Sequence, residues 1–230
     1  MTPTAPNTTD SSRKVFLIGA TGGVGRRLIA ALTTRGHRVT GVHHSQDTAD
    51  TVHHAGAVGL QADIAADTAA QFAQHMAGHD AVIFCAGAGG GGEQVDAIDG
   101  RGPGKAADAA AQAGVKRFVL VSVFMDAWRG EKSPGADFER YMSAKRTADV
   151  ALAATDLDWL IVRPGTLSDD AGTGKITAGI AVAYRDIPRD DVAAFITTAL
   201  FTPNLNRIAV EITGGDTPVE AAVTALTPFR

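Results

Sequence analysis

A short apolar run near the start of the chain turns at once into a glycine-rich segment and then into an amphipathic pattern. Residues 15–18 are all apolar, glycines follow at Gly19, Gly22 and Gly25, and apolar residues then recur at helical spacing from Leu28. This order predicts a buried strand, a tight turn and the start of a helix. Three glycines alone are weak evidence, but in this context they indicate a dinucleotide-binding turn. The alternative is a purely structural turn.

Each of the three glycines has its own physical reason. Gly19 permits the sharp turn out of the strand, Gly22 lets the backbone approach a pyrophosphate, and Gly25 lets the helix pack against the strand. The start of the helix then offers unpaired N–H groups and the positive end of its dipole to an anion. The segment therefore predicts a diphosphate site where the first strand passes into its helix.

Composition favours a small-molecule ligand. The chain has 230 residues, is 45% hydrophobic and carries 21 basic against 25 acidic residues, a net charge of -4. It can bury one core as a single domain, and it has no basic excess that would indicate nucleic acid or anionic lipid as a partner. Residues 1–12 are polar and predict a disordered leader rather than a signal peptide, with the folded domain at 13–230. No apolar run is long enough to span a membrane, so we expect a cytoplasmic protein.

Strands and helices are expected to alternate along the chain. The apolar runs predict strands at 15–18, 38–43, 57–61, 81–84, 117–123, 158–163 and 208–212, and the segments between them contain helical patterns. Because these strands are apolar on both faces, the fold class expected is α/β: a doubly wound, mostly parallel sheet in three α/β/α layers, the Rossmann fold. The block at 100–104, which includes Pro103, predicts that the fourth long helix begins only at Lys105.

The residues at the end of the second strand determine which of the two pyridine cofactors, NAD or NADP, is preferred. An acidic residue there binds the ribose 2′-hydroxyl of NAD, whereas cations accommodate the 2′-phosphate of NADP. Here the strand ends at His43, His44 and Ser45 without a carboxylate, and Arg26 opens the preceding helix. This favours NADP(H). NAD(H) remains possible, with Asp47 as the acid.

A tyrosine and a lysine lie four residues apart in a helix expected at about 137–154. This spacing places the Tyr141 phenol and the Lys145 ammonium on one face of the helix. The ordinary pKa of tyrosine is about 10, and a neighbouring cation favours the phenolate and lowers that pKa. Ser122, at the end of the most apolar strand, can donate to the same substrate oxygen. Such a pair is more often a surface pair, but here it follows a dinucleotide-binding pattern.

Taken together, these motifs resemble a known family. The glycine segment 19–25, the strand end at Ser122, the Tyr141-x-x-x-Lys145 pair and the Arg163-Pro164-Gly165 run are similar to the short-chain dehydrogenases/reductases. The resemblance is to their atypical branch, close to the NmrA-like and YhfK-like groups, and it extends from Lys14 to Leu226.

The resemblance implies a role for individual residues in binding the cofactor. The residues implied for the pyrophosphate are Gly19, Thr21, Gly22, Gly23, Val24 and Gly25. Those implied for the rest of the cofactor are Arg26, His44 and Ser45 at the adenosine phosphate, Asp63 and Ile64 at the adenine, Ala86 and Gly87 at its ribose, and Lys145, Pro164 and Gly165 at the nicotinamide end.

The expected activity is NADPH-dependent reduction of a small carbonyl substrate. Tyr141 would be the acid/base, Lys145 its tuner and cofactor anchor, and Ser122 the orienting donor. The substrate pocket is expected from 124–135 and 167–180, in a monomer or homodimer. One alternative is a non-catalytic NADP(H)-binding redox sensor of the NmrA type. Another is an epimerase that uses a bound cofactor transiently, which the short tail after Asp191 disfavours.

Neither the histidines nor the single cysteine predicts a further site. His43 and His44, like His53 and His54, are adjacent in the sequence, so the two members of a pair do not share a strand or helix face. No carboxylate lies at metal-ligand spacing, so no metal is expected. The apolar neighbours at 82–84 predict that Cys85 is a strand residue, and it is expected to be an inert, buried thiol.

Overall fold

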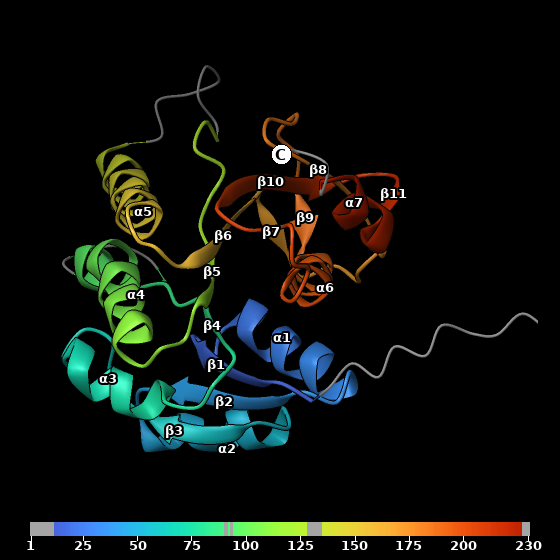
Figure 1. The fold of residues 1–230 in the computed structure, drawn as a ribbon. Helices are drawn as coiled ribbons and strands as arrows, with labels where there is room; N and C mark the ends of the chain where they lie inside the picture. Colours follow the sequence, from blue (N-terminus) through green and yellow to red (C-terminus); the bar gives the residue numbers. More distant parts are fainter. Residues whose placement is uncertain (1–11, 90–91, 93, 128–134, 227–230) are drawn as a thin grey trace, which may run out of the picture.

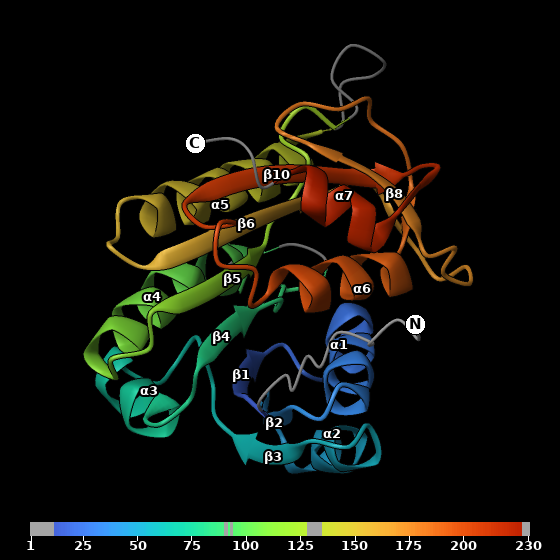
Figure 2. The same cartoon turned by 45° about the vertical axis from the view of Figure 1, so that its right-hand side comes forward.

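The structure of the protein is a computed structural model, and it describes residues 12–89, 92, 94–127 and 135–226. The predicted leader at 1–12 therefore lies outside the described residues except for Ser12, and so do most of residues 128–135 of the expected substrate pocket. The described chain forms a twisted sheet with helices on both faces (Figures 1 and 2).

The sheet has nine strands. In chain order they are β1 Lys14–Ile18, β2 Arg38–His43, β3 Val58–Gln61, β4 Ala81–Phe84, β5 Arg117–Val121, β6 Asp158–Pro164, β8 Lys175–Gly179, β10 Ile208–Gly214 and β11 Thr217–Pro218. Their order across the sheet is β11-β8-β10-β6-β5-β4-β1-β2-β3. All neighbours from β10 to β3 are parallel, whereas β8 pairs antiparallel with both β10 and β11. The predicted doubly wound, mostly parallel sheet is confirmed.

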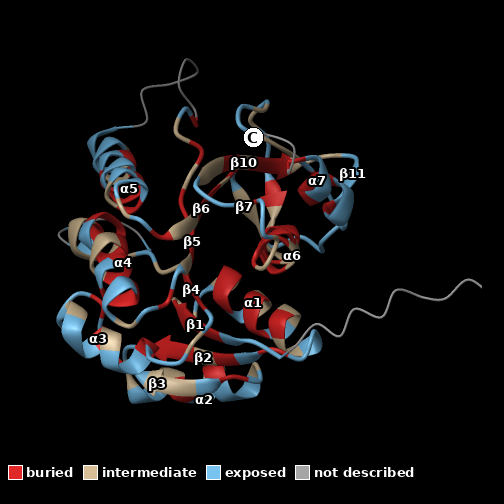
Figure 3. Cartoon of the chain, in the orientation of Figure 1, coloured by how far each residue is buried: buried red, intermediate tan, exposed pale blue. Residues whose placement is uncertain are grey.

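Two hydrophobic cores lie on the two faces of this sheet. The helices are α1 Gly23–Thr34, α2 Ala49–His54, α3 Ala69–Met76, α4 Gly102–Gln112, α5 Ala136–Ala153, α6 Arg189–Ala199 and α7 Val219–Ala225. In β1, Val15 and Leu17 point to the core under α1, α2, α6 and α7, whereas Phe16 and Ile18 point to the core under α3, α4 and α5. Successive strand residues face opposite sides, which is why the strands read as continuous apolar runs. The buried residues follow the sheet and the inner sides of these helices (Figure 3).

The start of the fourth helix, α4, differs from the sequence expectation. A π-helical segment, η2 Val95–Arg101, runs directly into α4, so the helix begins well before Lys105. The glycines in this stretch face close neighbours: a Cβ on Gly100 would lie 3.5 Å from Cβ of Ala144, and one on Gly102 would lie 3.1 Å from the ring of Phe84. Pro103 is the second residue of α4, at the junction where the π-helical segment η2 passes into the α-helix. Close packing against α5 and β4 thus outweighs the poor helix propensity.

The C-terminal third contains strands that its sequence pattern does not reveal. Within residues 167–180, which the sequence assigns only to the expected substrate pocket, β8 joins the main sheet and β7 Leu167–Ser168 pairs with β9 Ile187–Pro188. These strands are short or end in glycine, so neither their length nor their alternation is readable. Helix α6, which belongs to the same third of the chain, packs against α1 (Figure 2). None of the helices in the described part of the chain is long and apolar enough to cross a membrane.

Candidate cofactor and active site

The glycines of the turn between β1 and α1 have two different roles. Two of them are required by the fold, and the third leaves space for a ligand. Gly19 has φ +97°, and a Cβ there would overlap the backbone of Ala86. A Cβ on Gly25 would overlap the carbonyl oxygen of Gly19. Gly22 is exposed, has φ −74°, and a Cβ there would meet only the Gly19 carbonyl, at 3.4 Å. The first two shape the turn, and the third keeps the helix start open to a ligand.

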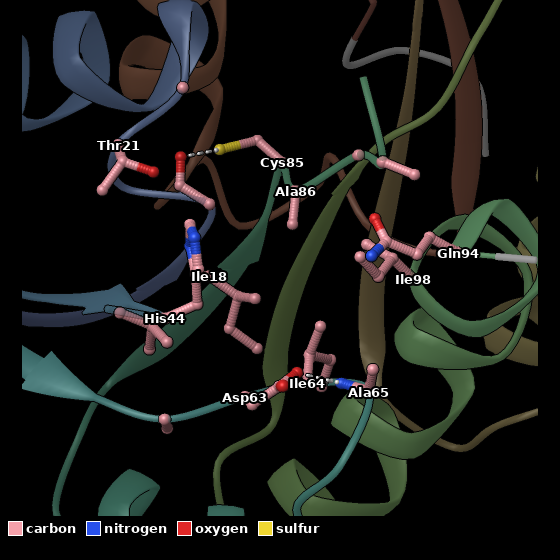
Figure 4. A pocket seen from close by; sticks show the side chains of 16 residues that line it. Ile18, Thr21, His44, Asp63, Ile64, Ala65, Cys85, Ala86, Gln94 and Ile98 are labelled. Carbon is pink, nitrogen blue, oxygen red and sulfur yellow. Dashed lines mark hydrogen bonds between the residues drawn. The ribbon is translucent and has the colours of Figure 1, made fainter. Parts of the chain in front are cut away.

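A cavity of about 390 Å³ opens beside this turn, at the carboxyl ends of β1, β2 and β4 (Figure 4). The predicted cofactor residues that line it are Gly19, Thr21, Gly22, His44, Asp63, Ile64, Ala86 and Gly87. Ile18 and Ile98 add apolar walls from opposite sides. An apolar cavity with a few polar groups at its rim is typical of a small-molecule site.

The segment that follows β3 at this cavity is held by two sets of hydrogen bonds. The Asp63 carboxylate accepts from the N–H of Ala65 at 2.8 Å, and the N–H of Asp63 donates to the Asp67 carboxylate at 2.8 Å. Lys105 on α4 donates to the carbonyls of Ile64, Ala65 and Asp67 at 2.8, 3.1 and 2.8 Å. Sequence reasoning missed Lys105, because its partners are backbone carbonyls far away in the sequence. Its ammonium fixes the segment where the adenine is expected.

A second cavity of about 620 Å³ continues from the first. The two share Gly22 and residues 85–88, so together they form one groove across the sheet edge. The second cavity also contains Gly23 and Val24 of α1 and the predicted catalytic residues Ser122, Tyr141 and Lys145. The structure thus brings the helix start and all three of these residues to one hollow.

Five predicted cofactor residues lie outside both cavities. These are Gly25, Arg26, Ser45, Pro164 and Gly165. Arg26 is exposed on α1, and the Ser45 hydroxyl lies 3.3 Å from the hydroxyl of Thr48. A Cβ on Gly165 would overlap the carbonyl oxygen of Arg185, so the Arg185 backbone covers this glycine. The roles of these five residues in holding the cofactor stay predictions.

Tyr141 and Lys145 face each other one turn apart on α5, as their spacing predicts. The Lys145 ammonium lies 5.6 Å from the centroid of the Tyr141 ring. The net effect on Tyr141 differs from the expectation: burial raises the pKa of the phenol, Lys145 lowers it, and Asp99 raises it, so the pKa lies above its ordinary value. The phenol is therefore protonated near neutral pH.

Asp99 is a buried acid in this site that sequence reasoning missed. It lies on η2, is 1% exposed, and its Oδ1 lies 3.0 Å from the Lys145 ammonium. Its Oδ2 accepts from the N–H of Ala88 at 2.9 Å. The sequence did not predict a helix at Asp99, because the glycine and proline residues that follow it have poor helix propensity. The available signal was an acidic residue beside Ile98, inside a stretch that also contains apolar Val95.

Ser122 lies in the connection just after β5 and is 5% exposed. Its hydroxyl has no hydrogen-bond partner among the described residues. It faces Asp149 on α5 and favours the charged form of that carboxylate without reaching hydrogen-bond geometry. Asp149 pairs with Arg163 at 2.9 Å, although burial still raises the pKa of Asp149. The Ser122 hydroxyl keeps its capacity to donate to a ligand.

Arg189 is a second residue that sequence reasoning missed. It begins α6 and lines the second cavity. A Cβ on Gly23 would lie 2.8 Å from its Cδ, so the arginine side chain crosses the first turn of α1. Its guanidinium pairs at 3.0 Å with Asp169, whose side chain is 74% exposed. A cation from the C-terminal third therefore reaches the same helix start as the glycine turn.

Cys85 lies between the two cavities, directly after β4. Its Sγ lies 3.5 Å from the carbonyl oxygen of Gly19, a contact drawn in Figure 4. Burial raises the pKa of the thiol to about 12, although Lys145 acts in the opposite direction. The thiolate is the reactive form of cysteine, so this thiol is inert at neutral pH.

Comparison with known proteins settles the family. A family model described as NAD(P)H-binding matches residues 19–203, which include the glycine turn, both cavities and α5. The chain belongs to the NAD(P)H-binding family. This confirms the predicted class of cofactor, a pyridine dinucleotide.

Several known proteins are similar to the chain over most of its length. YhfK from Bacillus subtilis, which is named an uncharacterized sugar epimerase, is 34% identical and covers 93% of this chain and 100% of its own. The solved structure of ylbE from Lactococcus lactis, called an oxidoreductase, is 28% identical with a TM-score of 0.81 and covers 93% of this chain and 96% of its own. ChuY from Escherichia coli O157:H7, called an anaerobillin reductase, is 26% identical with a TM-score of 0.75, and it covers 88% of this chain and 98% of its own. These matches confirm the resemblance to YhfK-like, atypical short-chain dehydrogenases/reductases and an oxidoreductase-type fold.

Proposed function

We propose that the protein is an NADPH-dependent reductase of a small carbonyl compound, with Tyr141 as the proton donor. The observation that carries this proposal is that Tyr141, Lys145 and Ser122 line the same cavity as the start of α1 at Gly22 and Gly23. A proton donor, a cation and a free hydroxyl next to a dinucleotide site are the groups that carbonyl reduction needs.

The residues of the groove fit the cofactor. Gly22 is open, and the first turn of α1 carries no acidic residue, so the helix dipole and the free N–H groups can receive a diphosphate. Ile64 and its neighbours would hold the adenine in the first cavity, and Lys145 would bind the nicotinamide ribose in the second. When bound, NADPH supplies the hydride.

Three side chains of the second cavity would act on the carbonyl group. Tyr141 holds a proton on its phenolic oxygen and would deliver it to the carbonyl oxygen. The free hydroxyl of Ser122 would donate a hydrogen bond to the same oxygen and orient it. Lys145 stabilises the phenolate that is left behind, because its ammonium lies over the ring of Tyr141.

The dimensions of the groove support a small substrate. The second cavity measures about 620 Å³ and must also hold the nicotinamide end of the cofactor. Pockets of about 300–1,000 Å³ hold one drug-sized molecule. The remaining space suits a compact aldehyde or ketone better than a nucleotide sugar. Reduction assays with a panel of small aldehydes and ketones, followed by the loss of dihydronicotinamide absorbance, test the proposal.

The relative named a sugar epimerase favours one competing function. An epimerase returns the hydride to the substrate, so NADPH would not be consumed during turnover of a sugar. A non-catalytic redox sensor would bind NADPH tightly and leave every carbonyl and sugar unchanged. Oxidation of NADPH in proportion to product formation supports the reductase and excludes both.

The preference for NADP is expected to depend on His44. His44 is exposed, lines the first cavity and directly follows β2, and the next two residues, Ser45 and Gln46, carry no carboxylate. We expect His44→Asp to weaken NADPH binding about tenfold or more and to leave or improve NADH binding, because a carboxylate repels the 2′-phosphate and accepts from the 2′-hydroxyl. Fluorescence titration with both dinucleotides measures the ratio.

Asp47 supplies the control for this experiment. It is exposed in the short helix η1 Gln46–Thr48 and does not line either cavity. Asp47→Asn is expected to leave the ratio of the two affinities unchanged. A selective loss of NADH binding in this variant would instead make Asp47 the ribose-binding acid and overturn the assignment to NADP.

Arg189 is expected to strengthen binding of the cofactor. Because its side chain crosses Gly23, we expect Arg189→Gln to weaken NADPH binding by about fivefold to tenfold, the effect of one charge-assisted hydrogen bond at a half-exposed site. The matched control is Arg35→Gln at the opposite end of α1, where Arg35 lies 4.0 Å from Glu220. Equal NADPH affinities in the two variants would show that Arg189 serves only to hold Asp169.

A further inference from the structure

Lys145 in the candidate active site forms an ion pair with a buried acid, Asp99. The side chains of Lys145 and Asp99 are 5% and 1% exposed, and their charged atoms lie 3.0 Å apart. Burying an ion pair has a high desolvation cost, and removing one partner leaves an uncompensated charge. A pair this deep at the wall of a ligand cavity indicates a specific role.

Asp99 is held in place from two further directions. Its second oxygen accepts from the N–H of Ala88, which belongs to the segment shared by both cavities. Gly87 packs against it so closely that a Cβ there would lie 3.2 Å from Asp99 Oδ1. The residue also lies in the π-helical segment η2, and π-helical turns occur frequently at functional sites. Its carboxylate therefore keeps one position relative to Lys145.

The Lys145 ammonium also lies 5.6 Å from the centroid of the Tyr141 ring, and the charges of Lys145 and Asp99 act on the phenol in opposite directions. Other ionisable groups face this region from several elements. Asp137 of α5 and Arg189 of α6 line the same cavity, while Cys85 at the end of β4 and Asp149 of α5 sense the charge of Lys145. Of the acids among these groups, Asp99 is the one within ion-pair distance of the ammonium.

We propose that Asp99 is a positioning residue that offsets the charge of Lys145, so that Tyr141 is held as a neutral phenol and the site acts as a proton donor. This rests on the proposed reductase function. In the reducing direction, bound NADPH would supply the hydride, with one of its C–H bonds breaking as the new C–H bond of the substrate forms. Tyr141 would break its phenolic O–H bond and pass the proton to the carbonyl oxygen. The products are an alcohol and the oxidised cofactor, and the phenolate then regains a proton from water.

The electrostatics of the site agree with this geometry. Burial and Asp99 both raise the pKa of Tyr141, and they outweigh Lys145, which lowers it. A lysine beside a tyrosine in a water-excluded site would otherwise favour the phenolate, the form that removes a proton from an alcohol. Asp99 thus favours the protonated phenol, which is the form that reduction of a carbonyl requires.

The titration of Tyr141 can be measured directly, because the chain contains only two tyrosines. In a Tyr184→Phe background, Tyr141 is the sole phenol, and its ionisation is followed by ultraviolet absorbance while circular dichroism monitors folding. We expect the parent to remain un-ionised up to about pH 10. Asp99→Asn is expected to ionise about one pH unit lower, because Lys145 then acts on the phenol without its counter-ion.

Asp96 provides a matched control. It lies on the same η2 segment, but its side chain is 43% exposed and pairs at 2.7 Å with Arg140 on the outside of α5. Asp96→Asn removes the same charge without reaching Lys145, so its Tyr141 titration should superimpose on that of the parent. A shift in Asp96→Asn equal to that in Asp99→Asn would show a general loss of negative charge and overturn the proposal.

Two other results would also overturn it. One is an Asp99→Asn protein that folds and titrates as the parent does, and the other is a parent whose phenol ionises below about pH 9. If Asp99→Asn does not fold, Asp99→Ser removes the same charge with a smaller side chain, and it must show the same downward shift. These measurements need no substrate, so they are independent of the carbonyl reduction assays, whose failure would concern only the proposed function.

Discussion

Tyr141→Phe is expected to lower the rate of carbonyl reduction by about 10³-fold and to leave the affinity for NADPH within about twofold. The substitution removes the proton donor and keeps the ring, which carries the contact with the Lys145 ammonium. General acids of this kind contribute about 10²–10⁴-fold to a rate. Steady-state kinetics and fluorescence titration of NADPH measure the two quantities separately.

Tyr184→Phe is the control for this prediction. Tyr184 stacks edge-on against Phe124 and bonds to the Thr166 hydroxyl, and it does not line the cavity that holds Tyr141. We expect this variant to keep the parent rate within about twofold. Full activity in Tyr141→Phe would mean that the proton comes from another group, and parallel losses of rate and NADPH affinity would mean that the hydroxyl serves in binding.

Gly25→Ala is expected to lower both the stability and the NADPH affinity, whereas Gly22→Ala is expected to lower the NADPH affinity alone, although the two glycines lie in the same turn. A methyl on Gly25 overlaps the Gly19 carbonyl, so the strand, turn and helix must move apart, which costs about 2–3 kcal/mol of stability and abolishes binding of NADPH. A methyl on Gly22 meets only one atom, at 3.4 Å, and its backbone is extended. Stability should stay within about 0.5 kcal/mol, while NADPH binding weakens at least about tenfold, because the methyl blocks the approach of the diphosphate.

Denaturant unfolding and NADPH titration of both variants test this contrast. Gly36→Ala serves as the control: Gly36 has φ +82°, and a methyl there meets no described atom within 4 Å. It should lose about 1 kcal/mol of stability from its left-handed backbone and bind NADPH as the parent does. Parent-like binding by a stable Gly22→Ala protein would remove the diphosphate from this helix start and, with it, the roles given to Tyr141 and Ser122.

Much of the sheet and part of the site follow from neighbours in the sequence. The apolar run 15–18, the glycine turn and the helix behind it are adjacent in the chain, so their pattern predicts their structure. The same holds for the four-residue spacing of Tyr141 and Lys145, which places both on one side of α5. The positions of His44 and Ser122 follow because the carboxyl ends of parallel strands meet at one edge.

Packing between distant segments decided the features that the pattern did not predict. The helix through residues 95–112 is stable because its glycines allow close approach to α5 and to the ring of Phe84, although the local composition disfavours a helix. Its early start carries Asp99 into the site. In the same way, α6 lies beside α1 and places Arg189 over Gly23.

The sequence by itself determined the α/β class, the dinucleotide turn and the candidate catalytic pair, because each depends on residues close together in the chain. The tertiary structure alone decided the electrostatics of that pair. The pKa of Tyr141 lies above its ordinary value because folding removes the phenol from water and brings Asp99 against Lys145. Desolvation and contacts between distant residues exist only once the chain has folded, so no local pattern could have revealed their sign.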